Sequence, residues 1–264
     1  MANEQIKKDI SISGSGNFSG GEYGKVSISG SGKGTGDIIC ETFKVSGSSK
    51  LEGNLTCETC SVSGSMKMTG KLTASDSLHI SGSQHVDDDV AADTMKVSGS
   101  SHVGKDLTAQ TLSVSGSLIV GGDCRTSNAK ISGGLKVEKG MEGEDICISG
   151  GFTINELLNV GRLEAHIGGG CRCGEIGGDT IIVTDDPKSD FLFTAIARLF
   201  GKRSHHRLTT GTIEGNRISL ECTDAEIVRG QDVVIGKECK IGRVEYSGTL
   251  EIQDNAEVGQ QVKD

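Results

Sequence analysis

Two closely spaced cysteine pairs are the first candidates for chemistry in this sequence. Cys57 and Cys60 form a C-x-x-C motif, and Cys171 and Cys173 form C-x-C. Thiolates at such spacings can bind zinc or exchange disulfides. Neither pair has a second pair at a zinc-finger distance, and a repeat places the first pair in columns of small or apolar residues. We expect free thiols that pack in the core, with metal binding as the alternative.

The segment at residues 30–35, GSGKGT, is similar to a phosphate-binding loop but fails the pattern. Lys33 is followed by Gly34 instead of Ser or Thr, and no helix is expected to present its N-terminus to a phosphate. Residues 87–89 form an acidic cluster without a partner that suggests paired acid and base roles. The sequence therefore predicts no catalytic residues, no cofactor and no metal site, and the protein is interpreted as not being an enzyme.

A column of basic residues recurs once per repeat and could bind a wall polymer or a protein partner. The alternative, which we favour, is a solvated face balanced by acids on another side. The column contains Lys33, Lys50, Lys67, His85, His102 and Lys136, and the expected balancing acids are Glu41, Glu58, Asp93 and Glu144.

The repeat that positions these residues is Ile or Val followed by Ser-Gly. Nine copies occur, and their glycines are 16 to 18 residues apart. A fixed short period is the mark of a solenoid. The glycines are Gly14, Gly30, Gly47, Gly64, Gly82, Gly99, Gly116, Gly133 and Gly150.

Apolar residues form columns at fixed positions of the repeat, often two residues apart, which favours short strands over helices. We predict an all-β fold, a parallel three-sided β-helix with about 17 residues per coil and coils about 4.8 Å apart. The recurring glycine fits a turn between strands. The predicted core columns include Leu55, Leu72, Val90 and Leu107, and also Val103 and Val120.

Composition agrees with a repetitive core of small side chains. The chain of 264 residues has 40 glycines, one proline and no tryptophan, yet 34% of its residues are apolar, too many for a disordered linker. The net charge of −9 and the lack of basic blocks beside aromatic residues exclude nucleic acid as the expected partner. Without a recognisable signal peptide or membrane span, the expected location is the cytoplasm.

Residues 187–207 differ from the repeat and predict a short helical insertion with a basic end. The expected domains are a tail at 1–10, the repeat β-helix at 11–186, this insertion, and terminal coils at 208–264. The helix could bind the membrane surface, bind a partner, or dock on its own β-helix. Its candidate residues are Phe191, Leu192, Phe193, Ile196, Leu199, Phe200, Lys202, Arg203 and Arg207.

The repeated (I/V)SG units, the insertion and the terminal phrases VRGQDVVIG and VEYSGTLEI together resemble the bactofilin family of polymer-forming cytoskeletal proteins. The resemblance covers about residues 10–185 and 208–262. It implies a right-handed β-helix, end-to-end filaments that form without nucleotide, and a scaffold role in cell shape, wall synthesis or flagellar motility. The implied partners are further copies, a paralogous bactofilin, or the inner membrane surface. The open alternatives are a β-helix enzyme of the acyltransferase or lyase type and an adhesin-like binding module.

Overall fold

The computed structural model describes residues 7–185 and 206–264. These residues form 22 strands and no helix, and neighbouring strands pair in parallel. The predicted all-β parallel solenoid is thereby confirmed. The chain divides into two compact units, Met1–Thr126 and Ser127–Asp264.

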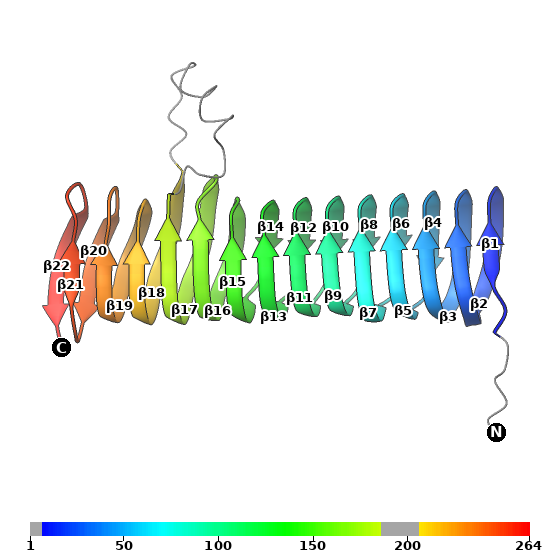
Figure 1. Ribbon diagram of the computed structural model, residues 1–264, viewed down its shortest axis with the longest axis horizontal. Coiled ribbons are helices and arrows are strands. Elements are labelled where there is room, and N and C mark those ends of the chain that lie inside the picture. Colours follow the sequence, from blue (N-terminus) through cyan, green and yellow to red (C-terminus); the bar gives the residue numbers. More distant parts are fainter. Residues whose placement is uncertain (1–6, 186–205) are drawn as a thin grey trace, which may run out of the picture. The chain divides into compact units, whose positions relative to one another are not determined.

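In the first unit, a coil of the repeat contains one short strand and one longer strand (Figure 1). The strands of this unit are β1 (Ile10–Ile12), β2 (Ser15–Ile28), β3 (Ser31–Val45), β4 (Ser48–Glu52), β5 (Leu55–Val62), β6 (Ser65–Met68), β7 (Leu72–Ile80), β8 (Ser83–Val86), β9 (Val90–Val97), β10 (Ser100–Val103), β11 (Leu107–Val114) and β12 (Ser117–Val120). From β4 to β10 each strand pairs with the strand two further along the chain, so that like strands stack on like. The longer strands β2 and β3 pair directly with each other.

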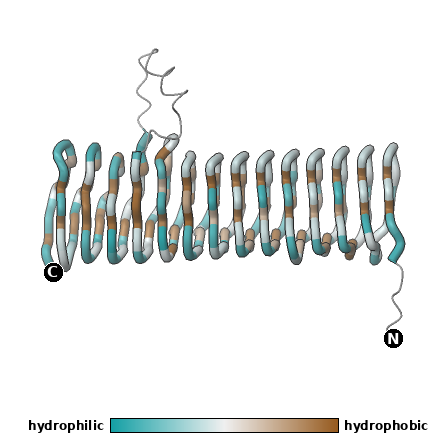
Figure 2. The backbone as a smooth tube through the Cα atoms, viewed as in Figure 1, coloured by the Kyte–Doolittle hydropathy of each residue, from teal (hydrophilic) through white to brown (hydrophobic). Residues whose placement is uncertain are grey.

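The predicted core columns are stacked in register. Leu55 pairs with Leu72, which pairs with Val90, which pairs with Leu107. On the short strands Val103 lies beside Val120. Leu55, Leu72, Val90, Leu107, Val103 and Val120 are all at most 1% exposed. The core is therefore a set of aliphatic columns, and this is the pattern of brown and pale bands that repeats from coil to coil in Figure 2.

The third corner of each coil lies inside the longer strand. In β5, Cys57 and Cys60 are buried, whereas Glu58 and Thr59 between them are not. Strict alternation would bury every second residue, so the inward face changes phase here. The pairing of β5 with β7 also shifts register at this point. Two of the three predicted sides of each coil are thus formed by one bent strand.

The Ser-Gly corner explains why glycine recurs. A Cβ atom built on Gly64 would lie 1.9 Å from the carbonyl oxygen of Gly47 in the preceding coil. The same carbonyl accepts a hydrogen bond of 2.8 Å from the backbone N–H of Ser65. Because backbone meets backbone at this corner, any side chain there would force the coils apart.

The second unit continues the same architecture and includes the terminal coils. Ile181 of β17 pairs with Ile218 of β18, so strands on either side of the insertion lie in adjacent coils. No helix in residues 7–185 or 206–264 has the length and apolar character needed to cross a bilayer. The strands are β13 (Cys124–Ile131), which enters this unit from the first, β14 (Gly134–Val137), β15 (Met141–Ile148), β16 (Phe152–His166), β17 (Gly170–Thr184), β18 (Arg207–Leu220), β19 (Thr223–Ile235), β20 (Lys240–Tyr246), β21 (Leu250–Ile252) and β22 (Glu257–Lys263).

Candidate functional site: open strand edges

The last coil of the second unit has strand edges without a partner. β22 pairs with β20, and β21 pairs with β19. Among the described strands, nothing pairs with the outer edges of β21 and β22. Backbone N–H and C=O groups along such edges are available to another strand.

The apolar columns also lose their cover in this coil. Ile235 in β19 is fully buried, but Ile252, its partner in β21, is 36% exposed. Ile241 in β20 is 3% exposed, whereas its partner Val258 in β22 is half-buried. Residues that a further coil would cover are therefore open at this end.

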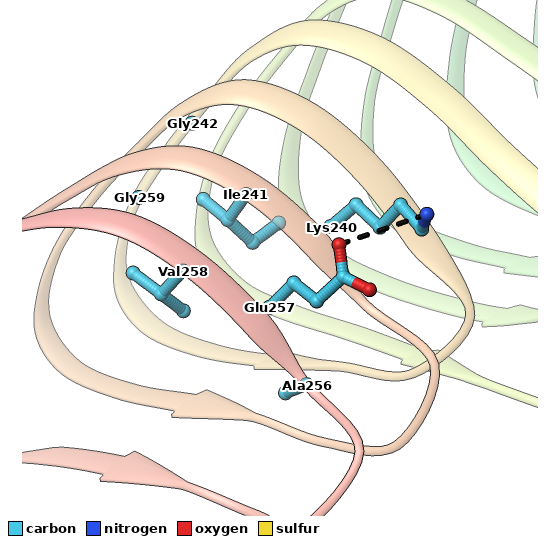
Figure 3. Close-up of a pocket in the computed structure, with 7 residues that line it drawn as sticks. All are labelled: Lys240, Ile241, Gly242, Ala256, Glu257, Val258 and Gly259. Atoms are coloured by element: carbon cyan, nitrogen blue, oxygen red, sulfur yellow. Dashed lines mark ion pairs between the residues drawn. The ribbon is translucent and has the colours of Figure 1, made fainter.

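Ile241 and Val258 also line an open hollow, shown in Figure 3. Ile241, Ala256 and Val258 supply its apolar part, and Gly242 and Gly259 complete its lining. At its rim Lys240 Nζ lies 3.6 Å from Glu257 Oε2. An apolar surface with a charged rim suits contact with another protein surface.

The first unit begins with a similar open edge. Ile10 and Ile12 of β1 are half-buried, although Val26 and Ile28, their partners in β2, are fully buried. Within the described residues, β1 covers only the last part of β2. Phe18 in the uncovered part remains 9% exposed.

The cysteines lie in the core columns. Cys57 pairs with Cys40 and Ala74, and Cys60 lies in the column of Phe43 and Leu78. All nine cysteines are free, and all but Cys147 are buried. Burial raises the pKa of Cys173 to about 12, which disfavours the reactive thiolate. Among the described residues, no three potential ligands lie close enough together to hold a metal ion.

Each carboxylate of residues 87–89 has a basic partner. Lys105 and Lys71 hold the pKa values of Asp88 and Asp89 below their usual range. Asp88 and Asp89, whose pKa values are lowered by these lysines, are therefore not poised to act as general acids. The contacts are His85–Asp87 (2.7 Å), Lys105–Asp88 (2.9 Å) and Lys71–Asp89 (2.6 Å).

The basic column of the first unit is assembled in register, and its balancing acids differ from those expected. Lys33 and Lys50 both contact Glu52, at 3.3 and 2.9 Å. The rings of His85 and His102 stack with centroids 4.5 Å apart. Neutralising acids thus come from positions two residues further on the same strand as Lys50 and not from another side. The column runs Lys33, Lys50, Lys67, His85, His102.

The GSGKGT segment is part of the solenoid wall. Gly30 occupies a Ser-Gly corner, where its Cβ position would lie 2.0 Å from the carbonyl oxygen of Gly14. Lys33 lies in β3, and a strand follows where a phosphate-binding loop would need a helix.

The candidate helix residues Phe191, Leu192, Phe193, Ile196, Leu199, Phe200, Lys202 and Arg203 lie outside the described residues. Arg207 is described, and it is the first residue of β18, where it forms an ion pair with Asp224. Its guanidinium is therefore engaged within the solenoid wall.

A parallel solenoid with uncovered edges is typical of proteins that associate strand to strand. Residues 4–103 match the bactofilin family, whose members are described as polymer-forming cytoskeletal proteins. The family resemblance predicted from the repeat is confirmed over this part of the chain. Its extension to residues 104–185 and 208–262 remains a prediction.

Two curated relatives come from Bacillus subtilis (strain 168), and both are uncharacterized proteins. YhbF is 35% identical over 89 residues, which are 34% of this chain and 33% of YhbF. YhbE is 47% identical over 51 residues, which are 19% of this chain and 22% of YhbE. The chain thus aligns with a third or less of the length of these relatives. No solved structure matches it.

Proposed function

We propose that this protein is a structural cytoskeletal element that self-assembles end to end into filaments without nucleotide. The observation that carries the proposal is the uncovered terminal coil, where Ile252 is 36% exposed although its partner Ile235 is fully buried. The family described as polymer-forming supports the same function. Further copies of this chain are the proposed partner, and a paralogous bactofilin could occupy the same edge.

Apolar burial and strand pairing at the chain's own edges would supply the free energy of such stacking. Covering Leu250, Ile252 and Val258 would contribute a part of the roughly 1.5–3 kcal/mol gained when such a side chain goes from full exposure to full burial, since each is already partly covered. Strand pairing at the edge would satisfy the unpaired backbone groups. Because apolar burial and backbone pairing suffice, no nucleotide hydrolysis is needed.

Val258→Lys is expected to shorten or abolish filaments while leaving the solenoid folded. The charged side chain would stand in the apolar column at the exposed end, where a stacked copy would bury it without a partner. Negative-stain microscopy in nucleotide-free buffer measures filament length, and circular dichroism checks the fold.

Gln260→Lys is the matched control, because Gln260 is an exposed residue of the same strand whose partner Arg243 is also exposed. This variant should polymerise like the parent. A parent protein that stays uniformly monomeric at every concentration would contradict end-to-end assembly.

In the cell, the proposed location is the cytoplasm, and the proposed role is a scaffold in cell shape, wall synthesis or flagellar motility.

We further propose that residues 187–207 contact the inner membrane surface. Lys202 and Arg203 would each add roughly 1 kcal/mol of attraction to anionic lipid.

Deletion of residues 189–203 is expected to abolish sedimentation with anionic liposomes and to leave filaments intact. Zwitterionic liposomes serve as the control, since they lack the attraction to basic side chains. Unchanged sedimentation would exclude the membrane role, and loss of filaments would instead assign the segment to assembly.

A further inference from the structure

One side of the first unit carries an acidic column along one edge and a partly basic column along the other. This acid–base side is formed by the second halves of β3, β5, β7, β9 and β11, which stack in register. The acidic edge contains Glu41, Glu58, Asp76 and Asp93, and the basic edge contains Lys44, Ser61, His79 and Lys96. Within each coil, the basic-edge residue follows the acid by three positions.

These charges have almost no ion-pair partners. On the neighbouring sides of the first unit several basic residues are paired with acids, as for Lys50 with Glu52 and Lys71 with Asp89. On the acid–base side, Glu41 contacts Lys7 at 3.4 Å. The remaining acidic and basic residues of this side make no ion pair within residues 7–185 and 206–264. They are Lys44, His79, Lys96, Glu58, Asp76 and Asp93.

Between the two edges runs a column of small hydroxyl residues. Thr42 pairs in register with Thr59, and their hydroxyl oxygens lie 3.3 Å apart. Ser77, Thr94 and Thr111 continue the column. With no large side chain along its middle, this side can approach another surface closely.

We propose that the acid–base side binds the same side of a second copy, so that two solenoids pair laterally and in parallel. A two-fold axis parallel to the stacking direction exchanges the two edges, so the acidic edge of one copy faces the basic edge of the other. This places Glu41 opposite Lys44 in one coil and Asp93 opposite Lys96 in another, while Glu58 and Asp76 lie opposite Ser61 and His79. An antiparallel pair would oppose acid to acid, so the charges select the parallel arrangement.

This inference rests on the proposed function, because end-to-end stacking multiplies a weak contact. Exposed ion pairs individually contribute little. A filament repeats them along its whole length, and linked contacts act with a high effective concentration. Lateral pairing should therefore be weak between single chains and strong between filaments, and salt should weaken it.

The test uses two variants with opposite changes on the two edges. Lys44→Glu/Lys96→Glu makes both edges acidic, and Glu41→Lys/Asp93→Lys reverses the two acids that would face Lys44 and Lys96 across the pair. Each is assembled separately, and negative-stain microscopy then measures the fraction of filaments lying in lateral pairs. We expect each variant alone to form single filaments, and mixing the two preassembled samples to restore lateral pairs at roughly 50 mM salt but not at roughly 500 mM.

Lys50→Glu/Lys67→Glu is the matched control, with the same charge change on the short strands β4 and β6. It should pair laterally like the parent. Single parent filaments at low salt, equal loss in the control, or no recovery on mixing would each overturn the lateral interface and leave end stacking in place.

Absence of filaments in every sample would instead contradict the proposed function. The mixing step is then read by sedimentation. Co-sedimentation of the two charge variants, but of neither alone, would still support lateral pairing, and its absence would overturn it. Recovery only on adding an anionic polymer would also overturn it, since that result assigns the basic edge to a different partner.

Discussion

Gly99→Ala is expected to destabilise the solenoid by about 3 kcal/mol or more, the range reached when a buried backbone contact is broken by a steric clash. A Cβ atom on Gly99 would lie 2.0 Å from the carbonyl oxygen of Gly82 and 2.5 Å from that of Ser81. Both atoms belong to the backbone of the preceding coil, so no side chain can rotate away. The coils must separate, and the hydrogen bond from Ser100 N–H to Gly82 C=O must weaken. Urea unfolding monitored by circular dichroism measures the loss.

The chain provides its own control for this substitution. Gly14 occupies the same Ser-Gly position in the first coil, and its Cβ position has no described atom within 4 Å. Gly14→Ala should therefore change stability by less than about 0.5 kcal/mol, as surface substitutions do. Equal destabilisation by both alanines would show that backbone conformation, and not coil-to-coil contact, demands glycine at this corner.

Much of the fold could be predicted because the repeat encodes contacts directly. In a solenoid each residue stacks on its equivalent in the next coil, so a column in the sequence becomes a column in space. Leu72 over Leu55 follows from counting 17 residues. The Ser-Gly corner likewise follows from the spacing of its glycines.

The irregular contacts could not be predicted, because they depend on volumes and side-chain directions. Gly34 interrupts an apolar column, and the structure shows why: Phe18 and Leu51 fill its space, with atoms 2.8 and 2.7 Å from where a Cβ would lie. The pairing of Lys50 with Glu52 differs from the expectation that the balancing acids lie on another side of the coil. Residues at i and i+2 share one face of a strand, and that spacing was the available signal.

The particular residues of the open edge at β22 do not follow from the repeat. The sequence does not state which residues of the last coil remain uncovered, since the apolar pattern of Leu250, Ile252 and Val258 continues that of earlier coils. Only the absence of a further strand in the described chain exposes them. A surface for assembly is thus built from core residues.

Leu107→Asp should be the most disruptive single change in an apolar column, with an expected loss on the order of 5 kcal/mol from the lost leucine packing and the buried carboxylate. Leu107 is fully buried and stacks on Val90, which is 1% exposed. The Val90 side chain cannot donate a hydrogen bond to the carboxylate. The variant should unfold locally around β9 and β11, and hydrogen exchange of their amides measures this.

Thr108→Asp is the matched change that tests which face of β11 points into the core. Thr108 is the next residue of β11 and is exposed, so its carboxylate would stay in water and cost little. We expect this variant to melt and assemble like the parent, while Leu107→Asp loses amide protection and filaments. The opposite outcome, a tolerated Leu107→Asp and a damaging Thr108→Asp, would mean that the inward face of the strand is displaced by one residue, because a one-residue shift exchanges the two faces of a strand.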